Sequence, residues 1–158
     1  MGIIIKKAEN DRVIDEAIKL TEEVFDVYEA PDYGEDGARE FREFLYGENL
    51  KRMREKGDIV FWCAYCGDKL AGMCALRNGS HISLLFVHGD FHRQGIGRML
   101  MDTACGFAFK EKNARNITVN SSPYGLPFYK NYGFIATDME RIEGGIRYTP
   151  MILLKRTD

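Results

Sequence analysis

The most informative stretch of the chain reads Val87-His88-Gly89-Asp90-Phe91-His92-Arg93-Gln94-Gly95-Ile96-Gly97-Arg98-Met99-Leu100. An apolar, strand-like run, Ile82–Val87, ends there, and two glycines one residue apart open an amphipathic helix. Glycine lets a backbone come close to a ligand. The free N–H groups in the first turn of a helix, together with the helix dipole, favour an anion. Because Arg93 and Arg98 add positive charge beside the glycines, the stretch predicts a pyrophosphate-binding loop.

Particular residues exclude two other phosphate-binding motifs. The dinucleotide fingerprint requires a third glycine three residues after Gly97, where the chain has Leu100. The Walker loop requires Gly-Lys-Ser/Thr, whereas Gly97 is followed by Arg98-Met99. A Gly-x-Gly after a strand also occurs in ordinary strand-to-helix turns, so the loop has to be weighed together with the rest of the chain.

The composition is typical of one soluble globular domain, which we expect to span residues 1–158. Hydrophobic residues make up 45% of the chain and charged residues 29%, which are ordinary values. No apolar run approaches the roughly 20 residues of a membrane helix. The start, Met1–Lys7, places its basic residues after a short apolar run, the reverse of a signal peptide. We therefore expect a cytoplasmic protein with no membrane partner.

The charge of the chain is nearly balanced but unevenly distributed. A net charge of -2 argues against nucleic acid as a partner, since nucleic-acid-binding proteins usually carry a basic surplus. Residues 22–43 hold nine acidic and two basic side chains. One end of the molecule is thus suited to cations and the other to phosphates.

The four cysteines, Cys63, Cys66, Cys74 and Cys105, are expected to be free thiols. The run Cys63-x-x-Cys66 has a spacing found in zinc sites, but residues three apart on one strand point to opposite faces. No second Cys/His pair follows at zinc-finger spacing. The sequence therefore predicts buried thiols in a reducing compartment, and no metal.

Apolar periodicity and turn residues predict an α/β fold with a mixed, predominantly antiparallel central sheet and helices on both faces. Gly67-Asp68 and Asn78-Gly79 have the chemistry of hairpin turns, so three strands form a meander that feeds a β-α-β crossover. The expected strands are Ile3–Lys7, Ile59–Cys66, Lys69–Arg77, Ser80–Val87, Asn116–Asn120 and a hairpin of Phe134–Arg141 with Arg147–Lys155. The expected helices are one capped by Asn10 or Asp11, Ala38–Lys56 with a break near Gly47, Gly97–Lys112 and Leu126–Tyr132, with Ala30–Gly37 as a loop.

The glycine loop and a second motif carry a resemblance to a known family. The loop is similar to the Arg/Gln-x-x-Gly-x-Gly/Ala acyl-CoA loop of the GNAT (GCN5-related) N-acetyltransferases, with His92 where the family has Gln or Arg. The run Leu126–Phe134 resembles the family's Phe/Leu-Tyr-x-x-x-Gly-Phe signature, in which Gly133 ends a short helix. The order of elements matches the GNAT fold along essentially the whole chain. The resemblance implies an N-acetyltransferase that uses acetyl-CoA.

The resemblance also implies roles for individual residues. Tyr129 would lie beside the CoA sulfur and protonate the departing thiolate. The strand backbone just before the loop would pair with the pantetheine arm, and one of its N–H groups would polarise the thioester carbonyl. The coenzyme-binding residues implied in this way are Leu85, Phe86, Val87, His92, Arg93, Gln94, Gly95, Ile96, Gly97, Arg98, Asn120, Ser122 and Tyr129.

An amine acceptor has to lose a proton before it attacks, because a free alkylamine has a pKa of about 10.4. Family members often use a glutamate early in the strand before the loop, but this strand begins Ser80-His81 and holds no acid. Strand alternation puts His81 on the same face as Leu85 and Val87. The expected base is therefore His81, or else a water chain.

The acceptor is expected to bind over the first two helices, where carboxylates and tyrosines suit a cationic amine. A polyamine, an antibiotic amine, a peptide N-terminus and a lysine all stay open as acceptors, and so does a donor larger than acetyl. The candidate acceptor-binding residues are Glu22, Asp26, Tyr28, Tyr33 and Glu35.

Three alternatives to direct transfer are weighed against it. A covalent acyl-cysteine is one, but no cysteine lies close in sequence to both motifs. A non-catalytic acyl-CoA-binding regulatory domain is the second, and both His92 and the missing strand glutamate are compatible with it. A nucleic-acid or protein interaction module is the third, and the acidic segment disfavours it. A homodimer stays open, since nothing in the sequence selects an interface.

Overall fold

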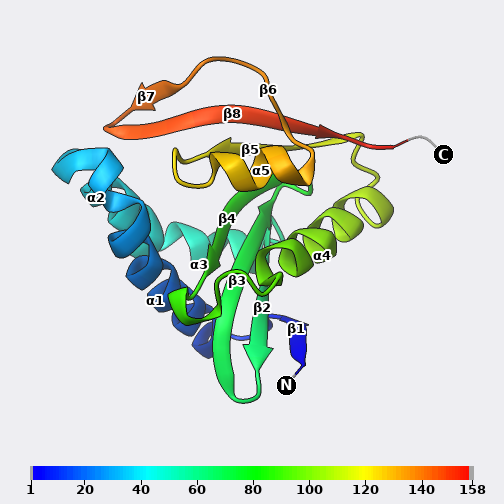
Figure 1. Ribbon diagram of the computed structural model, residues 1–158. Helices are drawn as coiled ribbons and strands as arrows, with labels where there is room; N and C mark the ends of the chain where they lie inside the picture. The colour runs from blue at the N-terminus through cyan, green and yellow to red at the C-terminus, as the bar shows by residue number, and fades with distance from the viewer. Residues whose placement is uncertain (1, 157–158) are drawn as a thin grey trace.

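The computed structural model describes residues 2–156 and has the mixed sheet that the sequence predicts (Figure 1). The strands lie in the order β1-β2-β3-β4-β5-β8-β6, and β7 pairs with β8. Neighbouring strands are antiparallel except for β4 and β5, which are parallel. The strands are β1 (Ile3–Lys7), β2 (Ile59–Cys66), β3 (Lys69–Arg77), β4 (His81–Val87), β5 (Asn116–Ser121), β6 (Ile135–Ala136), β7 (Arg141–Glu143) and β8 (Ile146–Leu154). The helices are α1 (Asp11–Tyr28), α2 (Ala30–Tyr46), α3 (Asn49–Glu55), α4 (Ile96–Lys110) and α5 (Leu126–Tyr132).

The sheet separates two hydrophobic cores. On one face α1, α2 and α3 bury an apolar stripe against the sheet, with Phe25 and Phe61 completely or almost completely buried. On the other face α4 and α5 pack around Leu100 and Trp62. Because successive strand residues point to opposite faces, β2 sends Phe61 to the first core and Trp62 to the second. The expected helices on both faces of the sheet are confirmed.

A β-bulge at Ser83 divides β4 into two parts. The pairing of β3 with β4 skips Ser83, which has no residue opposite it. The extra residue reverses the direction in which the side chains point. Ile82 packs into the core on the α4 side, whereas Leu84 and Phe86 pack into the core on the α1 side.

Because of this bulge, the predicted face of His81 is wrong. Without a bulge, His81 would share a face with Leu85 and Val87. In the structure Leu85 and Val87 pack on the α4 side, and the reversal at the bulge puts His81 on the opposite face.

The strands β4 and β5 are paired only near their start. Within residues 2–156 their pairing covers His81 with Thr118 and Ile82 with Val119. Beyond these pairs the two strands diverge, as Figure 1 shows. The β5-facing edge of β4 after Ile82 therefore borders an opening in the sheet, where its backbone groups are free to pair with a ligand.

Two local predictions are wrong. The expected loop over residues 30–37 is the first part of α2, with Pro31 in its first turn and a kink at Gly34, whose φ is +70°. A non-glycine residue rarely adopts that angle, and the backbone at Gly34 is not helical, so Gly34 divides α2 into a short first turn and a longer second part. The expected last hairpin is also shorter on its first side, where only β6 and β7 pair with β8.

The hairpin of β7 and β8 docks on α2 through two glycines. A Cβ on Gly37 would lie 2.3 Å from the carbonyl oxygen of Gly145, so only glycine permits this approach. Arg147 holds the contact by donating to the carbonyl oxygen of Asp32 (3.4 Å) and pairing with Glu140 (3.1 Å). The hairpin thus forms a wall beside the opening in the sheet.

None of the helices formed by residues 2–156 combines the length and the apolar character that crossing a membrane requires.

Candidate active site

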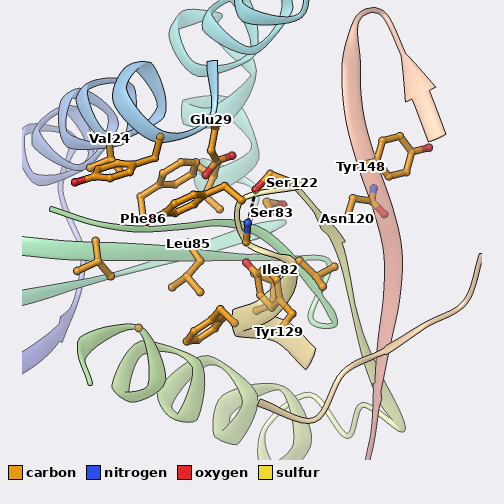
Figure 2. Close-up of a pocket in the computed structure, with 18 of the residues that line it drawn as sticks. Val24, Glu29, Ile82, Ser83, Leu85, Phe86, Asn120, Ser122, Tyr129 and Tyr148 are labelled. Atoms are coloured by element: carbon orange, nitrogen blue, oxygen red, sulfur yellow. Dashed lines mark hydrogen bonds between the residues drawn. The ribbon is translucent and has the colours of Figure 1, made fainter. Parts of the chain in front are cut away.

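A cavity of about 1050 Å³ occupies the opening between β4 and β5 (Figure 2). Its walls come from β4, the start of α4, the end of β5 with α5, the junction of α1 and α2, and the β7–β8 hairpin. The cavity therefore runs from the glycine loop at one end to the acidic segment at the other. Sites for small-molecule ligands typically measure about 300–1,000 Å³, so this cavity can hold a large, elongated molecule.

The glycine loop opens α4 as the sequence predicts. Gly95 is the residue before the helix, has a φ of +78° and brings no side chain to cap the first turn. A Cβ on Gly97 would lie 3.1 Å from the ring of Phe128, so glycine lets α4 and α5 approach closely. The loop residues that line the cavity are His92, Arg93, Gly95, Ile96, Gly97 and Arg98.

The first turn of α4 and two arginines therefore offer a site for an anion. The guanidinium of Arg98 lies over the ring of Tyr132, 5.0 Å from its centroid, which orients it at the helix start. Gln94, which the resemblance included, is exposed and does not line the cavity.

His92, at the position where the sequence departs from the family motif, holds the loop against the strand. Its Nε2–H donates to the carbonyl oxygen of Val87 at 2.7 Å. Its ring also packs against Tyr28, with centroids 4.8 Å apart, and Tyr28 packs in turn against Tyr124 at 5.1 Å. His92 thus ties the end of β4 to the loop, and its aromatic contacts close one side of the cavity.

The other residues that the resemblance assigned to the coenzyme also lie at the cavity. Leu85, Phe86 and Val87 line it from β4, beside the opening in the sheet. Asn120 and Ser122 line it from the end of β5 and the turn that follows. The structure therefore brings β4, the loop and the β5–α5 turn around one space, although they are separate in sequence.

Tyr129 lies on α5 in the same cavity and is 7% exposed. Phe128 and Phe134 hold its ring edge-on, with centroids 5.3 and 5.4 Å away. Burial, and after it the charge of Glu29, raise the pKa of the Tyr129 phenol far above its usual value. The phenol therefore keeps its proton at neutral pH, so it is present in the cavity as a hydrogen-bond donor.

Glu29 is a cavity residue that the sequence analysis missed. It lies at the junction of α1 and α2, and Figure 2 shows its carboxylate reaching into the cavity toward Ser122. Burial raises its pKa from 4.5 to about 7, a hydrogen bond from Ser122 opposes this, and the charge of Asp32 adds to it. Proline is favoured in the first turn of a helix, so Pro31 could have indicated that a helix begins beside Glu29.

Only part of the predicted acceptor site lies at the cavity. Tyr28 and Tyr33 line it, whereas Glu22, Asp26 and Glu35 do not. Arg42 pairs with Asp26 at 2.7 Å and with Glu22 at 3.6 Å, so these two carboxylates are engaged on the outer side of α1 and α2. The carboxylates that do line the cavity are Glu29, Glu40 and Glu143.

His81, the expected base, lies outside the cavity lining. Its Nδ1 and the Oγ1 of Thr118 share a hydrogen bond of 2.8 Å, at the place where β4 and β5 are still paired. Burial, followed by the charge of Arg77, lowers the pKa of His81 below 6.5. The structure does not bring this side chain to Tyr129 and the glycine loop.

The cysteines are free thiols, as predicted, and none of the four lines the cavity. Burial raises the pKa of Cys63 and of Cys105 to about 11 and that of Cys74 further. A thiol reacts as its thiolate, so these side chains are poor nucleophiles at neutral pH. Within residues 2–156, no three His, Cys, Asp or Glu side chains gather into a set that could hold a metal ion.

Comparison with known families agrees with this site. The family model of the acetyltransferase (GNAT) domain matches residues 29–155, which is most of the chain. The chain therefore belongs to the GNAT acetyltransferase family. No curated protein sequence matches it.

Many solved structures share the fold. A GCN5-related N-acetyltransferase from Rhodopseudomonas palustris has a TM-score of 0.81 and 19% identity, over 96% of this chain and 95% of its own. The PaiA N-acetyltransferase of Thermoplasma acidophilum, solved in complex with coenzyme A, has a TM-score of 0.80 and 20% identity, over 98% and 100%. A chimera of the spermidine N-acetyltransferase SpeG from Vibrio cholerae and hSSAT has a TM-score of 0.66 and 15% identity, over 96% and 95%.

Proposed function

We propose that this protein transfers an acetyl group from acetyl-CoA to the primary amine of a cationic acceptor, by direct attack in a ternary complex. One observation carries the proposal. A single cavity joins the glycine loop, the buried Tyr129 and an end lined by carboxylates. An anionic donor and a cationic acceptor would therefore enter from opposite ends and meet at the tyrosine.

The donor end has the features that coenzyme A requires. The uncapped first turn of α4, with Arg93 and Arg98, suits the pyrophosphate. The edge of β4 that diverges from β5 suits the amides of the pantetheine arm, which would pair with it like an added strand. When bound, acetyl-CoA supplies an activated thioester, and the chain supplies its position.

Direct attack needs few groups from the protein. The amine nitrogen forms a bond to the thioester carbonyl carbon, and the bond from that carbon to sulfur breaks. Tyr129 gives its proton to the departing sulfur and recovers one from the acetylated nitrogen. Positioning and a backbone N–H of β4 beside the carbonyl oxygen supply the rest of the rate enhancement.

The acceptor end favours a cation over a neutral or anionic amine. Glu40 and Glu143 line it, from α2 and from β7, together with the rings of Tyr33 and Tyr148. Carboxylates and aromatic faces both attract an ammonium group. This arrangement replaces the one expected from the sequence, in which Glu22, Asp26 and Glu35 had that role.

The second candidate function is a non-catalytic acyl-CoA-binding domain. The buried, protonated Tyr129 favours an enzyme, since binding alone does not require a proton donor beside the sulfur. An acyl-cysteine route is also disfavoured, because no cysteine lines the cavity formed by the described residues.

The test is the release of CoA thiol from acetyl-CoA, with and without a panel of amines. The panel holds spermidine, an aminoglycoside, lysine and a peptide with a free N-terminus. Amine-dependent release, strongest for acceptors with two or more positive charges, supports the proposal. Coenzyme A binding by calorimetry without release for any amine supports the non-catalytic alternative instead.

A further inference from the structure

We infer that Glu29 is the general base that takes the proton from the acceptor ammonium. The inference rests on the proposed function and adds the group that the sequence analysis sought in His81. The site needs such a group, because an alkylammonium cannot attack until it loses a proton. The part of β4 that faces the cavity, Ile82–Val87, presents no acidic side chain there.

The position of Glu29 fits this task. Glu29 and Tyr129 reach into the cavity from opposite walls, one from the α1–α2 junction and the other from α5 (Figure 2). The charge of Glu29 acts on the Tyr129 phenol, second only to burial. The two groups therefore share one space, in which an amine can meet Glu29 while the thioester sulfur lies beside Tyr129.

Ser122 lies on the side of the cavity toward which the carboxylate reaches. Its hydroxyl accepts a hydrogen bond from the N–H of Gly125, 3.0 Å away, so its own proton is free to point elsewhere. Figure 2 shows the Glu29 carboxylate reaching toward Ser122, and this hydroxyl lowers the pKa of the carboxyl. Ser122, in the turn that precedes α5, therefore faces the α1–α2 junction, where its hydroxyl can donate to the base.

The surroundings keep Glu29 poised to accept a proton near neutral pH. Burial raises its pKa to about 7, well above that of an exposed glutamate. A base is most useful when its pKa is close to the working pH. The titratable and charged groups that line the cavity with Glu29 are Tyr28, Tyr33 and Glu40 of α1 and α2, His92, Arg93 and Arg98 of the glycine loop and α4, Tyr124, Tyr129, and Glu143 and Tyr148 of the β7–β8 hairpin. Asp32 also acts on Glu29, and Arg147 acts on Tyr33.

The proton balance closes with these two residues. The Glu29 carboxylate takes one proton from the ammonium and passes it to solvent. The free amine then attacks the carbonyl carbon, and the bond to sulfur breaks. Tyr129 protonates the sulfur and regains the second nitrogen proton. The products are the acetylated amine and CoA thiol, with one proton released.

The test compares pH profiles of kcat/KM for the wild type, Glu29→Gln and Glu40→Gln, with the best acceptor of the amine panel. The wild-type profile is expected to fall below about pH 7, because the base must be ionised. Glu29→Gln is expected to lose about 10²–10⁴-fold at pH 7, since that is the range for a lost general base. The kcat/KM of Glu29→Gln should then rise about tenfold per pH unit as the pH approaches the pKa of the acceptor amine, because the free amine becomes more abundant. The difference in kcat/KM between this variant and the wild type should therefore shrink at high pH.

Two further variants separate proton transfer from structure. Glu40→Gln, the control, also removes a carboxylate from the cavity; it should raise the acceptor KM and keep the wild-type acid limb. Ser122→Ala should move the acid limb to higher pH, because it removes the hydroxyl that lowers the pKa of Glu29.

The outcomes separate this inference from the proposed function. A Glu29→Gln profile that runs parallel to the wild type at every pH overturns the role of Glu29 and leaves acetyl transfer standing. No wild-type turnover with any amine overturns the transfer reaction, and the role of Glu29 with it.

Discussion

Replacing Glu29 by glutamine is expected to stabilise the protein above neutral pH, although it lowers the activity at pH 7. Burial favours the neutral carboxyl, so the folded state holds the proton up to about pH 7 while the unfolded chain releases it near 4.5. The protonated Glu29 carboxyl makes its full contribution to the free energy of unfolding below pH 4.5. This contribution is lost as the pH rises through about 7. Glutamine has nearly the same shape and no charge to bury, so the variant escapes this loss.

The magnitude follows from the same values. Raising the pKa from 4.5 to about 7 corresponds to about 3.5 kcal/mol, at ~1.4 kcal/mol per pKa unit. The carboxylate is only half-buried and reaches into a cavity that admits water, and solvent screening reduces the effect. We therefore expect Glu29→Gln to gain between about 1 and 3 kcal/mol relative to the wild type above pH 8, and little below pH 5.

Urea unfolding of both proteins at about pH 5 and about pH 8.5 measures this difference. Glu35→Gln, which changes the same chemical group at an exposed position of α2, is the control and should show no comparable gain. Equal pH dependence for Glu29→Gln and the wild type would refute the reasoning, since Glu29 would then ionise as readily in the fold as in water.

Three further variants test the walls of the cavity. Gly37→Ala places a Cβ 2.3 Å from the Gly145 carbonyl oxygen, so we expect urea unfolding to show a free energy of unfolding that is lower by about 1–3 kcal/mol. The acceptor KM should also rise. Unchanged values would mean that the hairpin does not shape the acceptor end of the cavity. His92→Ala removes the 2.7 Å bond to Val87 and should weaken coenzyme A binding in calorimetry, although the histidine itself need not touch the coenzyme. Arg98→Gln should weaken the same binding by about tenfold and reduce its salt dependence, and equal salt dependence in the two proteins would place the phosphates elsewhere.

The sequence predicted those helix ends and turns that depend on residues close together along the chain. The short helix around Leu126–Tyr132 forms where the sequence predicts it and ends at Gly133, although it starts at Leu126 and not near Pro123 or Tyr124, which the position of Pro127 had indicated. Asn10 caps α1 through a 3.0 Å bond to the N–H of Val13. The loop before α4 was also predicted, since two glycines one residue apart after an apolar strand permit a tight turn into a helix.

The missed features depend on contacts between distant segments. The bulge at Ser83 has no local signature, and it decides which face of β4 receives His81. Glu29 is one of nine acids within residues 22–43, and only the fold makes it half-buried while leaving Glu35 exposed. The docking of Gly37 on Gly145 joins residues more than a hundred positions apart. Tertiary packing therefore selects, among similar side chains, those that form the site.

The most direct test of the central claim is the rate of amine-dependent thiol release from acetyl-CoA by the wild type and by Tyr129→Phe. Phenylalanine keeps the ring between Phe128 and Phe134 and removes only the hydroxyl, so the fold should be retained. Amine-dependent release that falls by about tenfold or more in the variant is the expected result, since the departing sulfur would lose its proton donor. Release that is unchanged in Tyr129→Phe, or release that no amine stimulates in the wild type, would contradict the account.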